Sequence, residues 1–147
     1  MERVYTRSPW YYKGGPVIQK DIPVWAIGFV YRISRIDTGK AYIGQKRLRR
    51  KLTRKPLKGK KRKRRSFVQS DWLQYFGSSN DLLIDLKKLG PGKFKREILY
   101  WCRSLSEMNW IELKQQVVEE AILRPNQYYN SFIGRRISRS QIRNLLK

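Results

Sequence analysis

The chain has 147 residues and a formal charge of +23, from 34 lysines and arginines against 11 acids, which suits one small domain with nucleic acid as the expected partner. A single cysteine and no histidine exclude an internal disulfide, a Cys/His zinc site, a histidine general base and a Ser-His-Asp triad. No apolar run approaches the ~20 residues of a membrane span and the first residues lack a signal-peptide pattern, so no membrane partner is expected.

The first half of the chain predicts a β-hairpin. Residues 1–24 are aromatic and turn-rich and predict an extended segment lying against the domain. The apolar pattern of residues 25–36 predicts a first strand and residues 40–46 a second, with Asp37-Thr38-Gly39 as the turn. Ten residues separate Tyr31 from Tyr42. The hairpin would bring these two tyrosines close enough to share one site, although spacing alone favours two ordinary strand tyrosines, and the argument for a site depends on residues further along the chain.

The basic run of residues 46–65 holds 14 basic residues in 20 and no acid. Repulsion between charges at this density disfavours a compact fold unless a polyanion is bound. Because the run begins just after Gly44, we expect it to lie beside the tyrosines; the alternative is a solvated basic loop or a targeting patch. The residues predicted to contact nucleic acid are Arg49, Lys51, Arg54, Lys55, Lys58, Lys60, Lys61, Arg62, Lys63, Arg64 and Arg65.

Two helices and a strand are predicted between the basic run and residue 101. Residues 70–76 predict a short helix that ends at Gly77. Ser78 or Ser79 can cap a second helix over residues 80–89, whose leucines recur at helical spacing. A Gly-Pro-Gly sequence ends that helix, and residues 94–101 predict the third strand.

The last predicted helix opens at Ser104 and Glu107, which have capping-box spacing, and is expected to run to about Leu123, before Pro125. Glu112 points away from its apolar arc. That arc is predicted to consist of Trp110, Ile111, Val117, Val118, Ala121 and Ile122.

These motifs together resemble a known family. Phe29-Val30-Tyr31, ten residues, Tyr42-Ile43-Gly44, a helix with Glu112 and a late Tyr129-Asn130 resemble the GIY-YIG nuclease family. The stretch Ser70-Asp71-Trp72 to Tyr75-Phe76-Gly77-Ser78-Ser79 is similar to the phage-encoded, Seg-type homing endonucleases of that family.

The resemblance covers roughly residues 27–131 and implies an α+β fold, with a small three-stranded antiparallel sheet flanked by helices. The predicted organisation is an extension at 1–25, a nuclease-like domain at 26–132 interrupted by the basic insertion 46–65, and a basic tail at 133–147.

The resemblance also implies a DNA endonuclease that hydrolyses phosphodiester bonds with Mg²⁺ or Mn²⁺, in the bacterial cytoplasm if it is phage-encoded. Glu112 takes the position of the metal ligand, and Glu119 is the fallback. One carboxylate suits Mg²⁺, which completes its shell with water and substrate phosphate.

The tyrosines and their neighbours take roles from the same resemblance. Tyr31 would be the base, assisted by Lys46, with Tyr42 orienting the water. A tyrosine with a pKa near ~10 needs nearby cations or metal for that role. Asn130 would support the site. Tyr75 stands where relatives carry a His or Tyr facing the site, and a core aromatic is the equal alternative.

The sequence departs from the family pattern at two positions. Phe29 stands at the first glycine, with Gly28 one residue early. Asp71 stands where the family needs an arginine to stabilise charge on the pentavalent phosphate. The replacement must come from the basic run, where Arg47, Arg49, Arg50 and Arg65 qualify. If a helical turn follows Gly44, Arg47 and Arg50 share a face and are the preferred pair.

The second hypothesis is a non-catalytic DNA- or RNA-binding module on the same scaffold. A third is a small ribosome-associated basic protein, which the charge permits but the motif order does not favour. The sequence identifies no protein partner.

Overall fold

The structure, a computed structural model, describes residues 8–134 and 137–140. The remaining residues of the predicted basic tail, 135–136 and 141–147, lie outside the described residues. The strands are β1 (Trp10–Tyr12), β2 (Gly15–Pro16), β3 (Gly28–Arg35), β4 (Ala41–Arg47), β5 (Arg49–Arg54), β6 (Arg64–Gln69), β7 (Phe94–Cys102), β8 (Phe132–Ile133) and β9 (Ile137–Ser138). The helices are α2 (Asn80–Leu89), α3 (Leu105–Val118) and the 3₁₀ turns η1 (Gln19–Asp21), η2 (Pro91–Lys93) and η3 (Ala121–Leu123).

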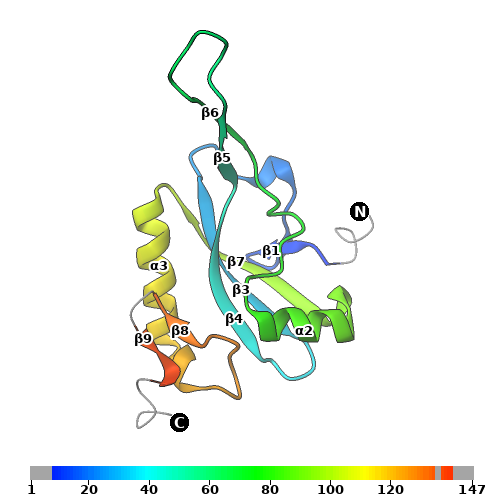
Figure 1. Cartoon of the computed structure of the whole chain (residues 1–147). Helices are drawn as coiled ribbons and strands as arrows, with labels where there is room; N and C mark the ends of the chain where they lie inside the picture. The colour runs from blue at the N-terminus through cyan, green and yellow to red at the C-terminus, as the bar shows by residue number, and fades with distance from the viewer. Residues whose placement is uncertain (1–7, 135–136, 141–147) are drawn as a thin grey trace.

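The α+β class is confirmed, but the central sheet is larger than the three strands expected. Its order is β2-β1-β7-β3-β4, with β1 parallel to β7 and the other pairs antiparallel (Figure 1). The three expected strands are its β7-β3-β4 part. The extra strands come from the N-terminal segment, because Trp10 is buried and donates its indole N–H to the Trp72 carbonyl at 2.7 Å.

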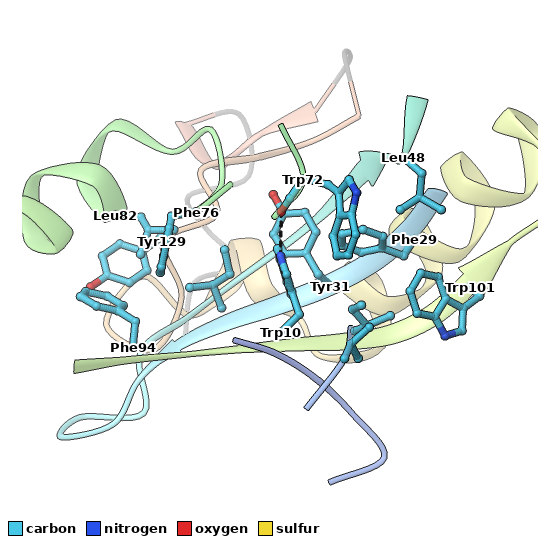
Figure 2. Close-up of a cluster of buried hydrophobic side chains, with 13 residues drawn as sticks. Trp10, Phe29, Tyr31, Leu48, Trp72, Phe76, Leu82, Phe94, Trp101 and Tyr129 are labelled. Atoms are coloured by element: carbon cyan, nitrogen blue, oxygen red, sulfur yellow. Dashed lines mark hydrogen bonds between the residues drawn. The ribbon is translucent and has the colours of Figure 1, made fainter. Parts of the chain in front are cut away.

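The two faces of the sheet are covered differently. On one face, Phe29, Tyr31 and Trp72 pack edge to face in an aromatic cluster around Trp10 (Figure 2). On the other face, α3 packs against β3 and β4 through Met108. Because neighbouring residues of a strand point to opposite faces, β3 places Tyr31 among the aromatic rings and Val30 against α3.

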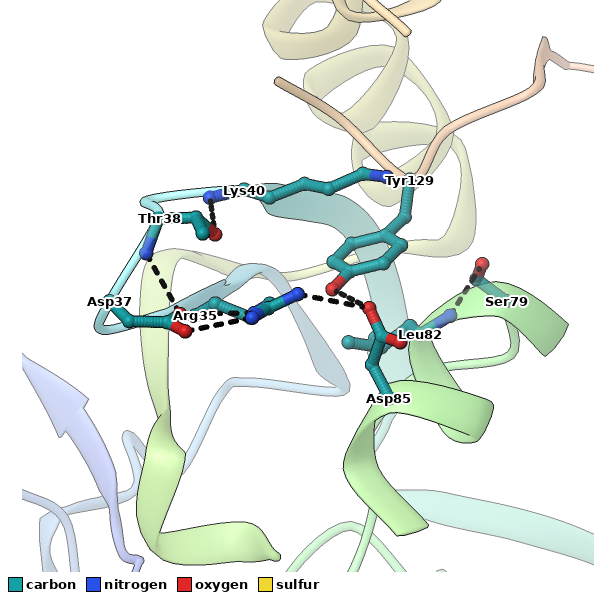
Figure 3. Close-up of polar contacts among 8 residues, drawn as sticks. All are labelled: Arg35, Asp37, Thr38, Lys40, Ser79, Leu82, Asp85 and Tyr129. Carbon is teal, nitrogen blue, oxygen red and sulfur yellow. Dashed lines mark hydrogen bonds and ion pairs between the residues drawn. The ribbon is translucent and has the colours of Figure 1, made fainter. Parts of the chain in front are cut away.

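The turn between β3 and β4 forms as predicted. Gly39 adopts φ +73°, and the Asp37 carboxylate accepts the Thr38 N–H at 2.8 Å. Arg35 bridges Asp37 and Asp85 of α2 at 2.7 and 3.3 Å, as Figure 3 shows. The hairpin is therefore tied to the helix that follows the basic run.

The helix predicted over residues 70–76 is wrong. The segment folds as hydrogen-bonded turns, in which Gln74 N–H donates to the Asp71 carbonyl and Tyr75 N–H to the Trp72 carbonyl. The buried Arg96 guanidinium binds the carbonyls of Leu73 and Tyr75 and so holds the segment in this conformation from β7.

The basic run is folded, contrary to the expectation from charge repulsion, and no helical turn follows Gly44. Strand β4 continues to Arg47, and β5 and β6 form an antiparallel hairpin that projects from the domain (Figure 1). Leu48 is buried at its base, where its N–H donates to the Ile27 carbonyl. Backbone pairing orders the ribbon, while its exposed cations are screened by solvent.

Helix α3 begins at its predicted cap but ends at Val118, before the expected Leu123, because Glu120 turns into the left-handed region at φ +52°. The predicted apolar arc is right in part: Ala121 and Ile122 are buried and Ile111 packs against the core, whereas Trp110, Val117 and Val118 are 61%, 54% and 69% exposed. The buried face carries Met108 and Gln116. Helix α2 matches its prediction, with Ser79 as cap.

Candidate active site

A cleft of about 840 Å³ opens along the β4 edge of the sheet, between the base of the β5–β6 hairpin, the 70–77 segment and α3. We call it the inner cleft. It brings together five of the residues that the sequence predicted for catalysis. These are Lys46, Arg47, Arg50, Tyr75 and Glu112.

Tyr31 and Tyr42 lie behind the inner cleft on neighbouring strands, as the hairpin predicts. Their ring centroids are 6.2 Å apart, and the register pairs Tyr31 with Gly44. A Cβ atom at Gly44 would lie 2.5 Å from the Tyr31 hydroxyl, so the glycine makes room for that phenol. The Tyr42 hydroxyl instead shares a 3.0 Å hydrogen bond with Ser78.

Tyr31 is fully buried, and its phenol is held in the neutral form. Burial raises its pKa well above the usual value of 10.0, and nearby Tyr75 and Tyr42 raise it further, with a smaller effect from Glu112. The Tyr75 ring stands edge-on to it at 5.8 Å and itself lines the cleft. Tyr75 is thus the phenol between Tyr31 and the cleft.

Gly28, one residue before the family's first glycine position, is also required by packing. A Cβ atom there would lie 2.6 Å from the Met108 sulfur and 2.7 Å from the Lys46 carbonyl. Because Gly28 has no Cβ atom, α3 can approach the sheet closely enough to form a wall of the inner cleft.

Glu112 faces the inner cleft from α3. Its Oε1 accepts a 3.1 Å hydrogen bond from Gln116, which also donates to the Ile43 carbonyl at 3.1 Å. Burial raises the pKa of Glu112 from 4.5 to about 7, against the opposing hydrogen bond from Gln116. The Gln116 amide thus fixes the carboxyl relative to the strand that carries Tyr42.

Asn130 holds the same edge strand from the other side. Its Oδ1 accepts the Ile43 N–H at 3.1 Å, and its Nδ2 donates to the Ile43 carbonyl at 2.9 Å. Asn130 therefore completes the outward hydrogen bonds of β4 and sits behind the cleft, without lining it.

Three cations line the inner cleft. Lys46 forms a 2.6 Å ion pair with Asp71 and lies 4.0 Å above the Tyr75 ring. The main cause that lowers the pKa of Asp71 is its hydrogen bond with Lys46 in this ion pair. Arg47 and Arg50 form no ion pair with any residue in 8–134 or 137–140.

The other two candidate arginines lie elsewhere. Arg49 lines a second cleft on the opposite face of the hairpin, and Arg65 lines a separate cavity of about 490 Å³ with Arg62 and Lys63. Arg47 and Arg50 do share one cleft, but strand ends bring them together and not the expected helical turn. The remaining basic residues of the run are exposed on the hairpin, and their contact with DNA stays a prediction.

Arg96 is a positioning residue that the sequence reading missed. It is 1% exposed, and its guanidinium donates to the carbonyls of Leu73 and Tyr75 at 2.8 and 2.9 Å. It also packs on the rings of Trp10 and Phe76. It therefore holds the segment that carries Tyr75. The one signal was an arginine at an inward position of the strand, between Phe94 and Ile98.

The donor set of the inner cleft fits a hard divalent cation bound by one carboxylate. No cluster of three or more His, Cys, Asp or Glu side chains occurs within the described part of the chain. Glu112 is a half-buried carboxyl that forms no ion pair with any residue in the described ranges, and a metal ion would supply the missing counter-charge. Glu119, the fallback, lies outside the cleft, forms an ion pair with Arg32 and accepts from Tyr128 at 2.8 Å.

No helix within the described ranges is long and apolar enough to cross a membrane.

Comparison with protein families gives one match. The chain matches the family model described as "Putative endonuclease segE, GIY-YIG domain" over residues 10–133. That span contains both tyrosines, the 70–77 segment and the whole of α3. Comparisons with curated proteins and with solved structures found no match.

Proposed function

The chain belongs to the GIY-YIG endonuclease domain family, of Seg type, and on that premise we propose that it is a metal-dependent DNA endonuclease that hydrolyses phosphodiester bonds. The observation that carries the proposal is one cleft lined by three cations, a tyrosine and two carboxyls, of which Asp71 is paired with Lys46 and Glu112 forms no ion pair with any described residue. From the Seg type of the family, we further propose a homing role and a phage origin.

The scissile phosphate is held by the cations of the inner cleft. Arg47 and Arg50 are available for a phosphate, and Arg can donate two parallel hydrogen bonds to its oxygens. Arg50 is the better candidate for the arginine that stabilises the pentavalent phosphate. It lines only the inner cleft, whereas Arg47 lines both clefts of the hairpin.

Glu112 holds the divalent cation, Mg²⁺ or Mn²⁺. When bound, the ion supplies Lewis-acid stabilisation of charge on the phosphate oxygens. The raised pKa of Glu112 means that ion binding and proton release from this carboxyl are coupled, so affinity for the ion rises with pH through about 7.

Tyr31 is the proposed base, acting with Tyr75 at the cleft wall. Because a neutral phenol cannot accept a proton, Tyr31 must first lose its own; the attacking water then gives its proton to this phenolate as its oxygen bonds to phosphorus, the bond to the leaving oxygen breaks and the leaving oxygen takes a proton from solvent. Lys46, 4.0 Å above the Tyr75 ring, is the cation that stands beside this pair of tyrosines. Tyr42 is the proposed residue that orients the water, and its own hydroxyl is held by the hydrogen bond with Ser78.

Lys46 and Asp71 form a pair that DNA binding would rearrange. Asp71 is 63% exposed and Lys46 19%, so the carboxylate sits at the mouth of the cleft above the lysine. A phosphate entering the cleft would compete with Asp71 for the ammonium group. Asp71 thus stays paired with Lys46 until a substrate phosphate displaces it.

The exposed cations of the β5–β6 hairpin hold the DNA backbone. Each phosphate that they neutralise releases a counterion, so affinity should fall steeply with salt.

The test is cleavage of supercoiled plasmid and of a structured RNA, side by side, with Mg²⁺ and with EDTA. The proposal predicts cutting of DNA that requires the metal. Binding of either nucleic acid without cutting of any substrate would favour the non-catalytic module.

A further inference from the structure

A second cleft, of about 380 Å³, lies on the opposite face of the β5–β6 hairpin from the inner cleft. We call it the outer cleft. It is bounded by the base of the hairpin, residues 24–27 and the start of α3 at Leu105. Its lining combines three cations with two aromatic rings and contains no acid. Those residues are Arg47, Arg49, Lys51, Trp25 and Phe67.

The pairing register of the hairpin explains why it separates two different clefts. Lys51 pairs with Phe67, so their side chains lie next to each other on one face of the ribbon. Arg50 pairs with Val68 on the other face, where Arg50 lines the inner cleft. Residues one position apart therefore serve opposite faces.

The two aromatic rings of the outer cleft are exposed to solvent, so a ligand that covered them would bury apolar surface, which is favourable. Phe67 is 69% exposed, and Trp25 is 43% exposed beneath the Arg103 guanidinium, which lies 4.0 Å from its ring centroid. Val24 beside them is fully exposed. An apolar ring among cations with no acid nearby suits a ligand that is both flat and anionic.

We propose that the outer cleft binds an unpaired base of the DNA substrate, stacked on Phe67, with the adjoining phosphates on Arg49 and Lys51. Stacking of bases on aromatic side chains in a cationic groove is how proteins hold single strands. A protein partner with an acidic surface is the alternative occupant, but it would need to bring both the charge and a flat apolar group.

The inference rests on the proposed DNA-binding function and extends it. Arg47 and Leu105 line both clefts, so one strand can run from the scissile phosphate in the inner cleft to a base in the outer cleft. Because a base within a duplex is stacked on both faces, the outer cleft favours DNA with a gap, a single-stranded end or an extruded base.

The test uses the full chain carrying Glu112→Gln to block cutting, and measures binding of a labelled single strand and a duplex of equal length by anisotropy. Phe67→Ala should weaken single-strand binding about 5–100-fold, while duplex binding changes less than about 2-fold and the salt slope stays constant because no charge is removed. Phe67→Tyr should retain single-strand affinity. Ile36→Ala is the matched control, since Ile36 is 67% exposed at the far end of the sheet.

An abasic scan of the same single strand supplies the second measurement. One abasic position should weaken binding to the Glu112→Gln protein but not to the protein that also carries Phe67→Ala, because the base and the ring then act as a pair.

The outcomes separate this inference from the proposed function. Failure of the parent protein to bind any DNA would overturn both. DNA binding with unchanged single-strand affinity in Phe67→Ala would overturn only the inference and leave the outer cleft to an acidic protein partner. Equal losses for single strand and duplex would also overturn it, since the ring would then support only the hairpin.

Discussion

Replacing Glu112 by glutamine should stabilise the folded protein at pH 8 in the absence of divalent metal. The glutamine amide has the shape of the carboxyl and can still accept the hydrogen bond from Gln116. It removes the charge that the half-buried site disfavours. When a substitution that removes a charged side chain stabilises the fold, the native residue is retained for function and not for stability.

The sign and size follow from the pKa of Glu112, which rises from 4.5 to about 7 on folding. The folded state binds this proton more tightly than the unfolded state, so the penalty is absent below about pH 4.5, grows as pH rises and is complete above about pH 7. The full change would correspond to about 3 kcal/mol. Because the carboxyl is partly exposed and screened by solvent, we expect about 1–2 kcal/mol.

Urea unfolding of the wild type and Glu112→Gln at pH 4 and pH 8, with EDTA, measures this difference. The variant should be more stable at pH 8 and equal at pH 4. Adding Mg²⁺ at pH 8 should then stabilise the wild type and leave the variant unchanged. A variant that is less stable at pH 8, or a difference independent of pH, would refute the reasoning about a strained carboxyl.

Tyr31→Phe should slow single-turnover cleavage by ~10²–10⁴-fold, more than Tyr42→Phe does; small and equal effects would remove Tyr31 from the base role. Arg50→Lys, which keeps the charge and loses the planar fork, should lower turnover by ~10²-fold with DNA affinity retained, whereas Arg49→Lys should keep turnover. Uniform mild losses at both arginines would mean that the run acts only as a diffuse field. Gly44→Ala should destabilise the fold by about 1–3 kcal/mol in urea unfolding, because its Cβ would lie 2.5 Å from the Tyr31 hydroxyl. Tyr31→Phe should recover part of that loss, and a strictly additive double variant would exclude the clash.

Elements specified by nearby residues were predictable from the sequence. The turn at residues 37–39, the cap at Ser79 and the cap at Ser104 each depend on a side chain bonding to backbone within three residues. For the same reason the β3–β4 hairpin and its tyrosine pair could be placed from the turn and the apolar pattern of the segments on either side of it.

Elements decided by distant contacts were not predictable. Strand β1 is three residues long and joins the sheet because Trp10 is buried and bonds to Trp72, 62 positions away. The 70–76 segment has helix-forming residues, but Arg96 binds its carbonyls from β7. A long-range contact overrides local propensity in both cases.

The buried face of α3 could not be predicted fully from its apolar pattern, because a polar residue near the candidate site is buried on it. The apolar stripe predicts which side chains share a face, but not which face meets the sheet. Here polar Gln116 is buried because it bonds to the Ile43 carbonyl and to Glu112, and Trp110 on the apolar stripe is left exposed. Local rules fail where polar groups are held inward for a site.

The candidate site could be assembled in outline from the order of its motifs, since Glu112 lines the inner cleft and Tyr31 and Tyr42 lie together behind it. Its supporting residues could not. Gln116 carries only the signal of lying four positions after Glu112 on one helix, and Arg96 looks like any other cation in a chain with 34 of them.

The most direct test of the central claim is single-turnover cleavage of plasmid DNA by the wild type and Glu112→Gln in Mg²⁺, with DNA binding measured on the same samples. The account predicts that the variant binds DNA within a few-fold of the wild type and cuts on the order of 10³-fold more slowly or worse, since the cation held there is worth several kcal/mol to the transition state. Equal cutting by the two proteins, or a folded variant that loses DNA binding and cutting together, would contradict it.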